Sequence, residues 1–142
     1  MTYENPWLYN SEPFTADLIA DYVSFVYCIT NTTTNKKYIG KKSFYARKYK
    51  VVKKKRKKLT VESDWQTYYG SNEILVNDVA TLGTDKFSRV ILRLCKSKGE
   101  ASYFEAKEQF AVDAVLSVNY YNNWISVRVR KSHMSHIKLV SE

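Results

Sequence analysis

The 142-residue chain lacks the features that define several common protein classes. It has no apolar run long enough to span a bilayer, and its first residues lack the basic start and apolar stretch of a secretory signal. We therefore expect no membrane partner and a cytoplasmic location. Only two cysteines are present, Cys28 and Cys95, and they form no CxxC pair. We expect buried free thiols rather than a disulfide or a zinc site.

Acidic residues are scarce, and one segment has none. Lys and Arg outnumber Asp and Glu by 23 to 14, which gives a formal net charge of +9. Residues 47–58 hold nine basic side chains and no acid. So dense a run repels itself unless a polyanion neutralises it, and a phosphate backbone is the obvious polyanion. We predict nucleic-acid contact here; a solvated loop and a nuclear-import signal are the alternative interpretations.

Two predicted strands bring a pair of tyrosines together. Residues 24–30 and 36–40 have strand composition and flank a polar turn. If Thr30 pairs with Asn35, Tyr27 lies directly opposite Tyr38, on the same face of the sheet. The alternative is a plain aromatic contact in the core.

The rest of the pattern predicts an α+β fold, in which helices pack on a small three-stranded antiparallel sheet. A helix follows Ser71 or Asn72 and ends at Gly83, a third strand spans residues 87–94, and a long helix spans residues 100–116. We divide the chain into an N-terminal arm at 1–22 with a weak helix at 16–22, a domain at 23–125 with a basic insertion at 47–63, and a basic tail at 126–142 with a short strand at 124–129.

The long predicted helix carries a candidate functional acid. At 100° per residue, Glu108 lies in the middle of the arc of Ala101, Phe104, Ala111 and Val115, and Glu105 lies at its edge. A sheet-facing carboxylate is costly to bury unless it is paired or binds a metal. We therefore predict that Glu108 faces the hairpin, with Glu105 as the alternative acid and a solvated helix rim as the plainer interpretation.

Several of these segments resemble the GIY-YIG nucleases. Phe25-Val26-Tyr27 and Tyr38-Ile39-Gly40 resemble the two motifs that name the family, with Phe-Val in place of the first Gly-Ile. Lys107-Glu108-Gln109-Phe110 resembles the segment of the metal-binding glutamate, and Tyr121-Asn122 resembles the Tyr-Asn that follows it. The resemblance covers residues 24–125 and is closest to short stand-alone members from tailed-phage genomes.

The family's catalytic arginine has no clear counterpart. Ten residues after Tyr38 the chain has Lys48, while Arg47 comes one residue early and Arg56 eight residues late. We favour Arg47, on the expectation that residues 42–50 form a helix, and Arg56 stays the alternative. A lysine lacks the bidentate phosphate grip of arginine.

The resemblance implies a metal-dependent endonuclease of bacteriophage origin that hydrolyses phosphodiester bonds in DNA in the host cytoplasm. Glu108 would bind Mg²⁺ or Mn²⁺, and Arg47 would offset charge on the phosphorus. Tyr27, helped by Tyr38, would orient or deprotonate the attacking water. The rivals are an inactive nucleic-acid-binding protein of this fold, a nuclease of structured RNA, and a basic protein that binds another protein. Expected nucleic-acid contacts are Lys41, Lys42, Lys53, Lys54, Lys55, Arg56, Lys57, Lys58, Asn122, Arg128 and Arg130.

Overall fold

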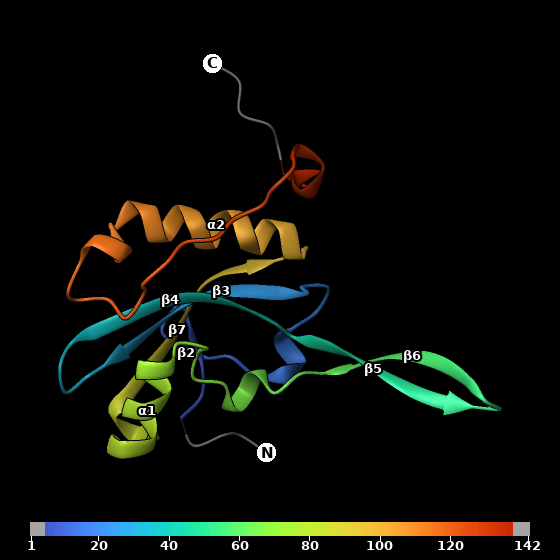
Figure 1. Cartoon of the computed structure of the whole chain (residues 1–142), viewed down its shortest axis with the longest axis horizontal. Coiled ribbons are helices and arrows are strands. Elements are labelled where there is room, and N and C mark those ends of the chain that lie inside the picture. Colours follow the sequence, from blue (N-terminus) through green and yellow to red (C-terminus); the bar gives the residue numbers. More distant parts are fainter. Residues whose placement is uncertain (1–4, 138–142) are drawn as a thin grey trace.

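A mixed five-stranded sheet forms the centre of the computed structural model, which describes residues 5–137 except for the side chains of Lys50 and Lys58 (Figure 1). The strand order is β2-β1-β7-β3-β4, with β1 parallel to β7 and the other neighbours antiparallel. The predicted α+β class is confirmed, but the sheet is larger than the three strands expected. The strands are β1 (Leu8–Tyr9), β2 (Glu12–Pro13), β3 (Ser24–Asn31), β4 (Lys36–Ser43) and β7 (Phe87–Cys95).

The β3–β4 hairpin closes two positions away from the predicted register. Asn31 pairs with Lys36, so Tyr27 lies opposite Gly40 and not opposite Tyr38. The Asn31 side chain accepts a hydrogen bond from the backbone N–H of Thr33 at 3.0 Å, which holds the loop to four residues. Because the shift is an even number of residues, the tyrosines still share a face, with ring centroids 6.2 Å apart on a diagonal.

Strand β3 is buried on both faces, and this separates two packing layers. Phe25, Tyr27 and Ile29 belong to an aromatic core that also holds Trp7 and Trp65. The other face of the sheet packs under helix α2 (Lys98–Ala111), while helix α1 (Glu73–Leu82) lies on the opposite side (Figure 1). Tyr27 is therefore held by aromatic packing rather than by solvent-exposed contacts.

Helix α1 begins and ends where the sequence predicts, whereas α2 begins two residues before the predicted start at Glu100 and ends early. Asn72 caps α1 by accepting from the Leu75 N–H at 3.0 Å, and Gly83 ends it at φ 96°. Helix α2 stops at Ala111, five residues before the predicted end. Asp113 follows in the left-handed region, with φ 51°, and a short 3₁₀ helix, η4 (Ala114–Leu116), comes after it.

Both terminal segments pack against the domain. The N-terminal segment places Trp7 and Phe14 in the aromatic core and adds β1 and β2 to the sheet, with only a short 3₁₀ helix, η1 (Ala16–Leu18). The strand predicted at 124–129 is absent; this segment runs along α2 without regular structure, then forms η5 (Lys131–Met134) (Figure 1). Residues 1–4 and 138–142 of the predicted arm and tail lie outside the described residues.

The basic insertion is a two-stranded ribbon, formed by β5 (Tyr45–Val52) and β6 (Lys55–Glu62). Lys53 and Lys54 have φ of 51° and 63°, as a type I′ turn requires, and this turn matches the twist of the flanking strands. The helix expected at 42–50 is therefore wrong. The ribbon projects from the body of the molecule (Figure 1).

The remaining short helices are η2 (Trp65–Thr67) and η3 (Thr84–Lys86). In the described part of the chain, no helix is both long and apolar enough to cross a membrane.

Candidate functional site

A cleft of about 270 Å³ opens at the edge of the sheet, along β4. Tyr38 belongs to the face of the aromatic core, while Glu105 and Gln109 come from α2 on the other face, so the cleft spans the edge strand. The segment after Tyr121 closes the third side. The lining residues are Tyr38, Lys41, Ser71, Glu105, Gln109, Asn122, Trp124 and Ser126.

The two motif tyrosines differ in their access to the cleft. Tyr38 is half-buried, lines the cleft, and shares a hydrogen bond of 3.1 Å with the Ser71 hydroxyl. Tyr27 lies behind it, only 1% exposed, between Tyr38, Tyr68 and Trp7. Burial raises the pKa of Tyr38, and it raises the pKa of Tyr27 well above the usual value. Both phenols are therefore neutral near pH 7.

Gly40 is needed for space rather than for backbone conformation. A Cβ at this position would lie 2.6 Å from the Tyr27 Cζ and 2.9 Å from the Tyr38 Cε2, and it would also overlap the Tyr27 hydroxyl. Any side chain here would push the two rings apart. The glycine of the Tyr38-Ile39-Gly40 motif thus sets how closely the tyrosines approach.

Glu105 is the carboxylate beside the tyrosines. Its half-buried side chain lines the cleft, and burial raises its pKa, while the charge and the backbone N–H of Lys41 lower it. Burial is the main cause of the raised pKa of Tyr27 and of Tyr38, and the charge of Glu105 adds to both shifts. The acid given as the alternative therefore occupies the cleft.

Glu108 lies on the exposed rim of α2 and does not line the cleft, as in the plainer interpretation given above. Its side chain is exposed, and its charge acts instead on Cys28 and Tyr120, whose pKa values it raises. The predicted arc depended on Val115, which lies beyond the end of α2. The buried side of α2 includes Ala106 and Gln109, whereas Ala111 is exposed, so the side that faces the sheet is centred away from Glu108.

The cation in the cleft is Lys41 rather than an arginine. Its Nζ donates to the Ser102 hydroxyl at 2.5 Å. Arg47 and Arg56 lie on the exposed ribbon, and neither lines the cleft. Lys42 forms an ion pair with Asp64 at 2.6 Å, which lowers the pKa of that carboxyl.

Two amide side chains hold the edge strand in place. Asn122 accepts from the Ile39 N–H at 3.0 Å and donates to the Ile39 carbonyl at 2.8 Å, and Gln109 donates to the same carbonyl at 3.0 Å. Asn122 thus lines the cleft with its amide committed to β4, although we predicted a nucleic-acid contact. Trp124, which the sequence did not single out, is 73% exposed at the cleft. Its exposed ring offers a flat aromatic surface for stacking at the cleft.

The other predicted nucleic-acid contacts lie away from the cleft. Arg128 and Arg130 are exposed on the segment that runs along α2. The side chain of Lys58 lies outside the described part of the structure. The exposed ribbon carries Lys53, Lys54, Lys55, Arg56 and Lys57.

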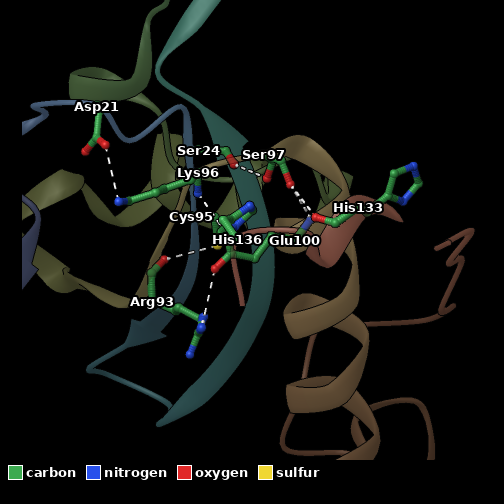
Figure 2. Close-up of polar contacts among 9 residues, drawn as sticks. All are labelled: Asp21, Ser24, Arg93, Cys95, Lys96, Ser97, Glu100, His133 and His136. Atoms are coloured by element: carbon green, nitrogen blue, oxygen red, sulfur yellow. Dashed lines mark hydrogen bonds and ion pairs between the residues drawn. The ribbon is translucent and has the colours of Figure 1, made fainter. Parts of the chain in front are cut away.

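A second polar cluster fastens the tail to the start of α2 (Figure 2). Glu100, only 3% exposed, pairs with His136 and with Arg93 (3.3 Å), and it accepts from the Lys96 N–H at 2.9 Å. These partners outweigh burial and lower the pKa of Glu100. The Ser97 hydroxyl donates to the backbone carbonyl of His133 at 3.1 Å. Within residues 5–137, no group of three His, Cys, Asp or Glu side chains is placed to hold a metal ion.

Taken together, a tyrosine-bearing hairpin, a glycine that lets the rings meet, and a helical glutamate across the cleft define a GIY-YIG domain. The family model described as "Putative endonuclease segE, GIY-YIG domain" matches residues 7–125, and the chain belongs to this family. Comparison with curated proteins and with solved structures gave no match.

Proposed function

We propose that this protein is a metal-dependent endonuclease that hydrolyses phosphodiester bonds in DNA, with the β4–α2 cleft as its active site. The observation that carries the proposal is the half-buried carboxylate of Glu105, which lines the same cleft as Tyr38 and Lys41. A phage origin and action in the host cytoplasm belong to the same proposal, and they rest on the resemblance to short phage members alone.

The donor set of the cleft suits a hydrated hard cation. Mg²⁺ commonly binds proteins through one or two carboxylates and keeps several waters, and Glu105 is the cleft's carboxylate among the described residues. Burial penalises the anionic form of Glu105, so a neighbouring cation would offset that penalty. A bound Mg²⁺ or Mn²⁺ would supply polarisation of a phosphoryl oxygen and stabilisation of the leaving oxyanion.

The tyrosines act as neutral phenols in this proposal. Their raised pKa values oppose a role as general base, so Tyr38 orients the attacking water through its hydroxyl. Tyr27 does not line the cleft; it fixes the Tyr38 ring from behind, at 6.2 Å between centroids. Tyr38 is accordingly the catalytic residue, and Tyr27 is a positioning residue.

Lys41 supplies the positive charge at the reacting phosphate in this conformation. It neutralises charge but lacks the paired hydrogen bonds of a guanidinium. The absence of an arginine from the described cleft favours one alternative, a nucleic-acid-binding protein of this fold with little or no cleavage.

Cleavage of supercoiled plasmid tests the proposal. Wild-type protein with Mg²⁺ or Mn²⁺ should nick or linearise the plasmid, and EDTA should stop the reaction. Glu105→Gln should reduce the rate at least about 100-fold, as loss of a group that stabilises transition-state charge does. The matched control, Glu108→Gln on the same helix, should stay within about threefold of wild type. Equal loss in both variants would reject Glu105 as the site, and intact plasmid with every metal would favour the binding protein or a structured-RNA substrate.

A further inference from the structure

Among the described side chains of the β5–β6 ribbon, those from Arg47 to Thr60 have a composition that packing does not explain. Every residue from Arg47 to Thr60 whose burial is described is exposed. The ribbon extends away from the sheet and helices (Figure 1). A two-stranded ribbon without a hydrophobic face packed on other elements is only marginally stable in water. Its sequence therefore serves contacts with something outside the chain.

Positive charge covers both faces of the ribbon and its tip. In the register, Arg47 lies opposite Thr60 and Val51 opposite Arg56, which puts both arginines on one face. Lys48 lies opposite Leu59 and Val52 opposite Lys55, which puts lysines on the other face. Lys53 and Lys54 form the turn. A ligand that satisfies all these groups must surround the ribbon with negative charge.

Exposed apolar groups lie between these cations. Val51 is 74% exposed and Tyr49 is 57% exposed, and the Arg56 guanidinium stacks at 3.8 Å from the centroid of the Tyr49 ring. Stacking holds the guanidinium in one plane, which suits paired hydrogen bonds to a base edge or a phosphate. Apolar side chains beside such donors fit the thymine methyl groups in a major groove.

We propose that the β5–β6 ribbon inserts into the major groove of B-form duplex DNA and holds the duplex against the cleft. That groove is about 12 Å wide and admits a two-stranded ribbon, whereas the minor groove is only about 6 Å wide. Eight-residue strands reach roughly 26 Å at about 3.3 Å per residue, enough to follow the groove past both phosphate walls. The deep, narrow major groove of A-form RNA excludes the ribbon, so the substrate class is duplex DNA.

The assignment of the ribbon takes only one point from the proposed function, namely that the ligand is a nucleic acid. Binding is measured with EDTA present, where no cleavage occurs, so the two ideas fail separately. Cleavage without groove contact would reject the ribbon assignment, and groove contact without cleavage would reject the nuclease assignment.

The test variant combines Lys53→Asn with Lys54→Gly. Asn-Gly is the preferred type I′ pair, so the ribbon keeps its fold while its tip loses two charges. The control variant, Lys86→Asn with Lys107→Asn, removes the same charge from exposed positions outside the ribbon. Fluorescence anisotropy with a 30-base-pair DNA duplex and the RNA duplex of the same sequence gives the affinities at several salt concentrations. Dimethyl sulfate, which methylates guanine N7 in the major groove and adenine N3 in the minor groove, reports which groove is covered.

Wild-type protein should bind the DNA duplex at least tenfold more tightly than the RNA duplex and protect guanine N7. The tip variant should lose that protection, and its slope of log affinity against log salt should be shallower by about 1.8, because each lost phosphate contact removes about 0.9. The control should keep the N7 protection. Equal affinity for RNA, protection of adenine N3 alone, or N7 protection that survives in the tip variant would each overturn the proposal.

Discussion

The cleft and the ribbon are built from consecutive strands, yet they are organised in opposite ways. Strand β4 carries Tyr38 and Gly40 against the aromatic core, whereas β5, starting two residues after β4 ends, carries Arg47 and Tyr49 in solvent. Phe44, the completely buried residue between the strands, anchors the transition. In the cleft, close packing holds the side chains in fixed positions, as chemistry at a reacting centre requires. In the ribbon, the side chains are not held by packing, and a high density of positive charge is enough to attract a polyanion.

Gly40→Ala should have the largest effect on stability and cleavage, because Gly40 lies in the closely packed cleft. The added methyl would overlap the Tyr27 ring and crowd Tyr38, so one ring must move. Overpacking of this kind costs roughly 3 kcal/mol of unfolding free energy, and we expect cleavage to fall at least about 100-fold as the tyrosines separate. Urea unfolding and plasmid cleavage measure the two effects.

Gly83→Ala is the control for Gly40→Ala. Gly83 ends α1 at positive φ, so alanine there costs stability through backbone strain but leaves the tyrosines untouched. Cleavage by this variant, measured well below its melting temperature, should stay near that of wild type. A Gly40→Ala protein that keeps full cleavage would show that ring spacing does not limit the reaction.

Glu100→Gln should give the next largest effect, because it loosens the helix that carries Glu105. The substitution removes the charge that pairs with His136 and Arg93, at a cost of about 2 kcal/mol for a buried charged hydrogen-bond group (Figure 2). The pKa of Glu100 is lowered in the folded protein, so its contribution is present above the usual Glu value of about 4.3 and is lost as pH falls through the lowered value. Urea unfolding from pH 7 to pH 3 should show wild type converging on the variant. A constant difference would mean that Glu100 acts through packing and not through charge.

The sequence predicted the packed half of the molecule better than the exposed half. The β-branched and aromatic composition of residues 24–30 located β3, and Asn72 and Gly83 marked the ends of α1, because these signals are local. The even shift in hairpin register left Tyr27 and Tyr38 on one face. The choice of Glu108 over Glu105 depended on an arc that included Ala111 and Val115. Ala111 is exposed, and Val115 lies beyond the end of α2, after Asp113 takes a left-handed conformation that no local pattern announced.

The ribbon was missed for a different physical reason. A type I′ turn normally carries Asn-Gly, whereas here Lys53 and Lys54 occupy both positive-φ positions. The flanking lysines and arginines also have higher helix than strand propensity. The basic composition of residues 47–58 indicated a polyanion as partner, but it did not indicate that this segment would fold as a two-stranded ribbon.

Removal of the ribbon should have little effect on stability, in contrast to the large loss expected for Gly40→Ala. Replacing residues 46–61 by Asn-Gly joins Tyr45 to Glu62, which already pair across the two strands. Because the excised residues are mostly exposed, we expect the unfolding free energy to change by less than about 1 kcal/mol. Urea unfolding with an unchanged m-value would confirm that the domain folds as before. A loss comparable to that of Gly40→Ala would show that the ribbon stabilises the fold.

The smallest expected effect is a gain in stability when the acid in the cleft is neutralised. The pKa of Glu105 is raised by burial, so its ionised form costs folding free energy at neutral pH, and this cost disappears as pH falls below the usual Glu value of about 4.3. Glu105→Gln keeps an oxygen to accept from the Lys41 N–H, so without added metal it should melt a few degrees at most above wild type at pH 7 and level with it near pH 3.5. Glu108→Gln, at an exposed position, should melt with wild type at both values. Added Mg²⁺ should raise the melting temperature of wild type but not of Glu105→Gln, because a ligand stabilises only the protein that binds it. If added Mg²⁺ also raises the melting temperature of Glu105→Gln, the cation binds elsewhere, and the cleft is not the metal site that the proposed chemistry requires.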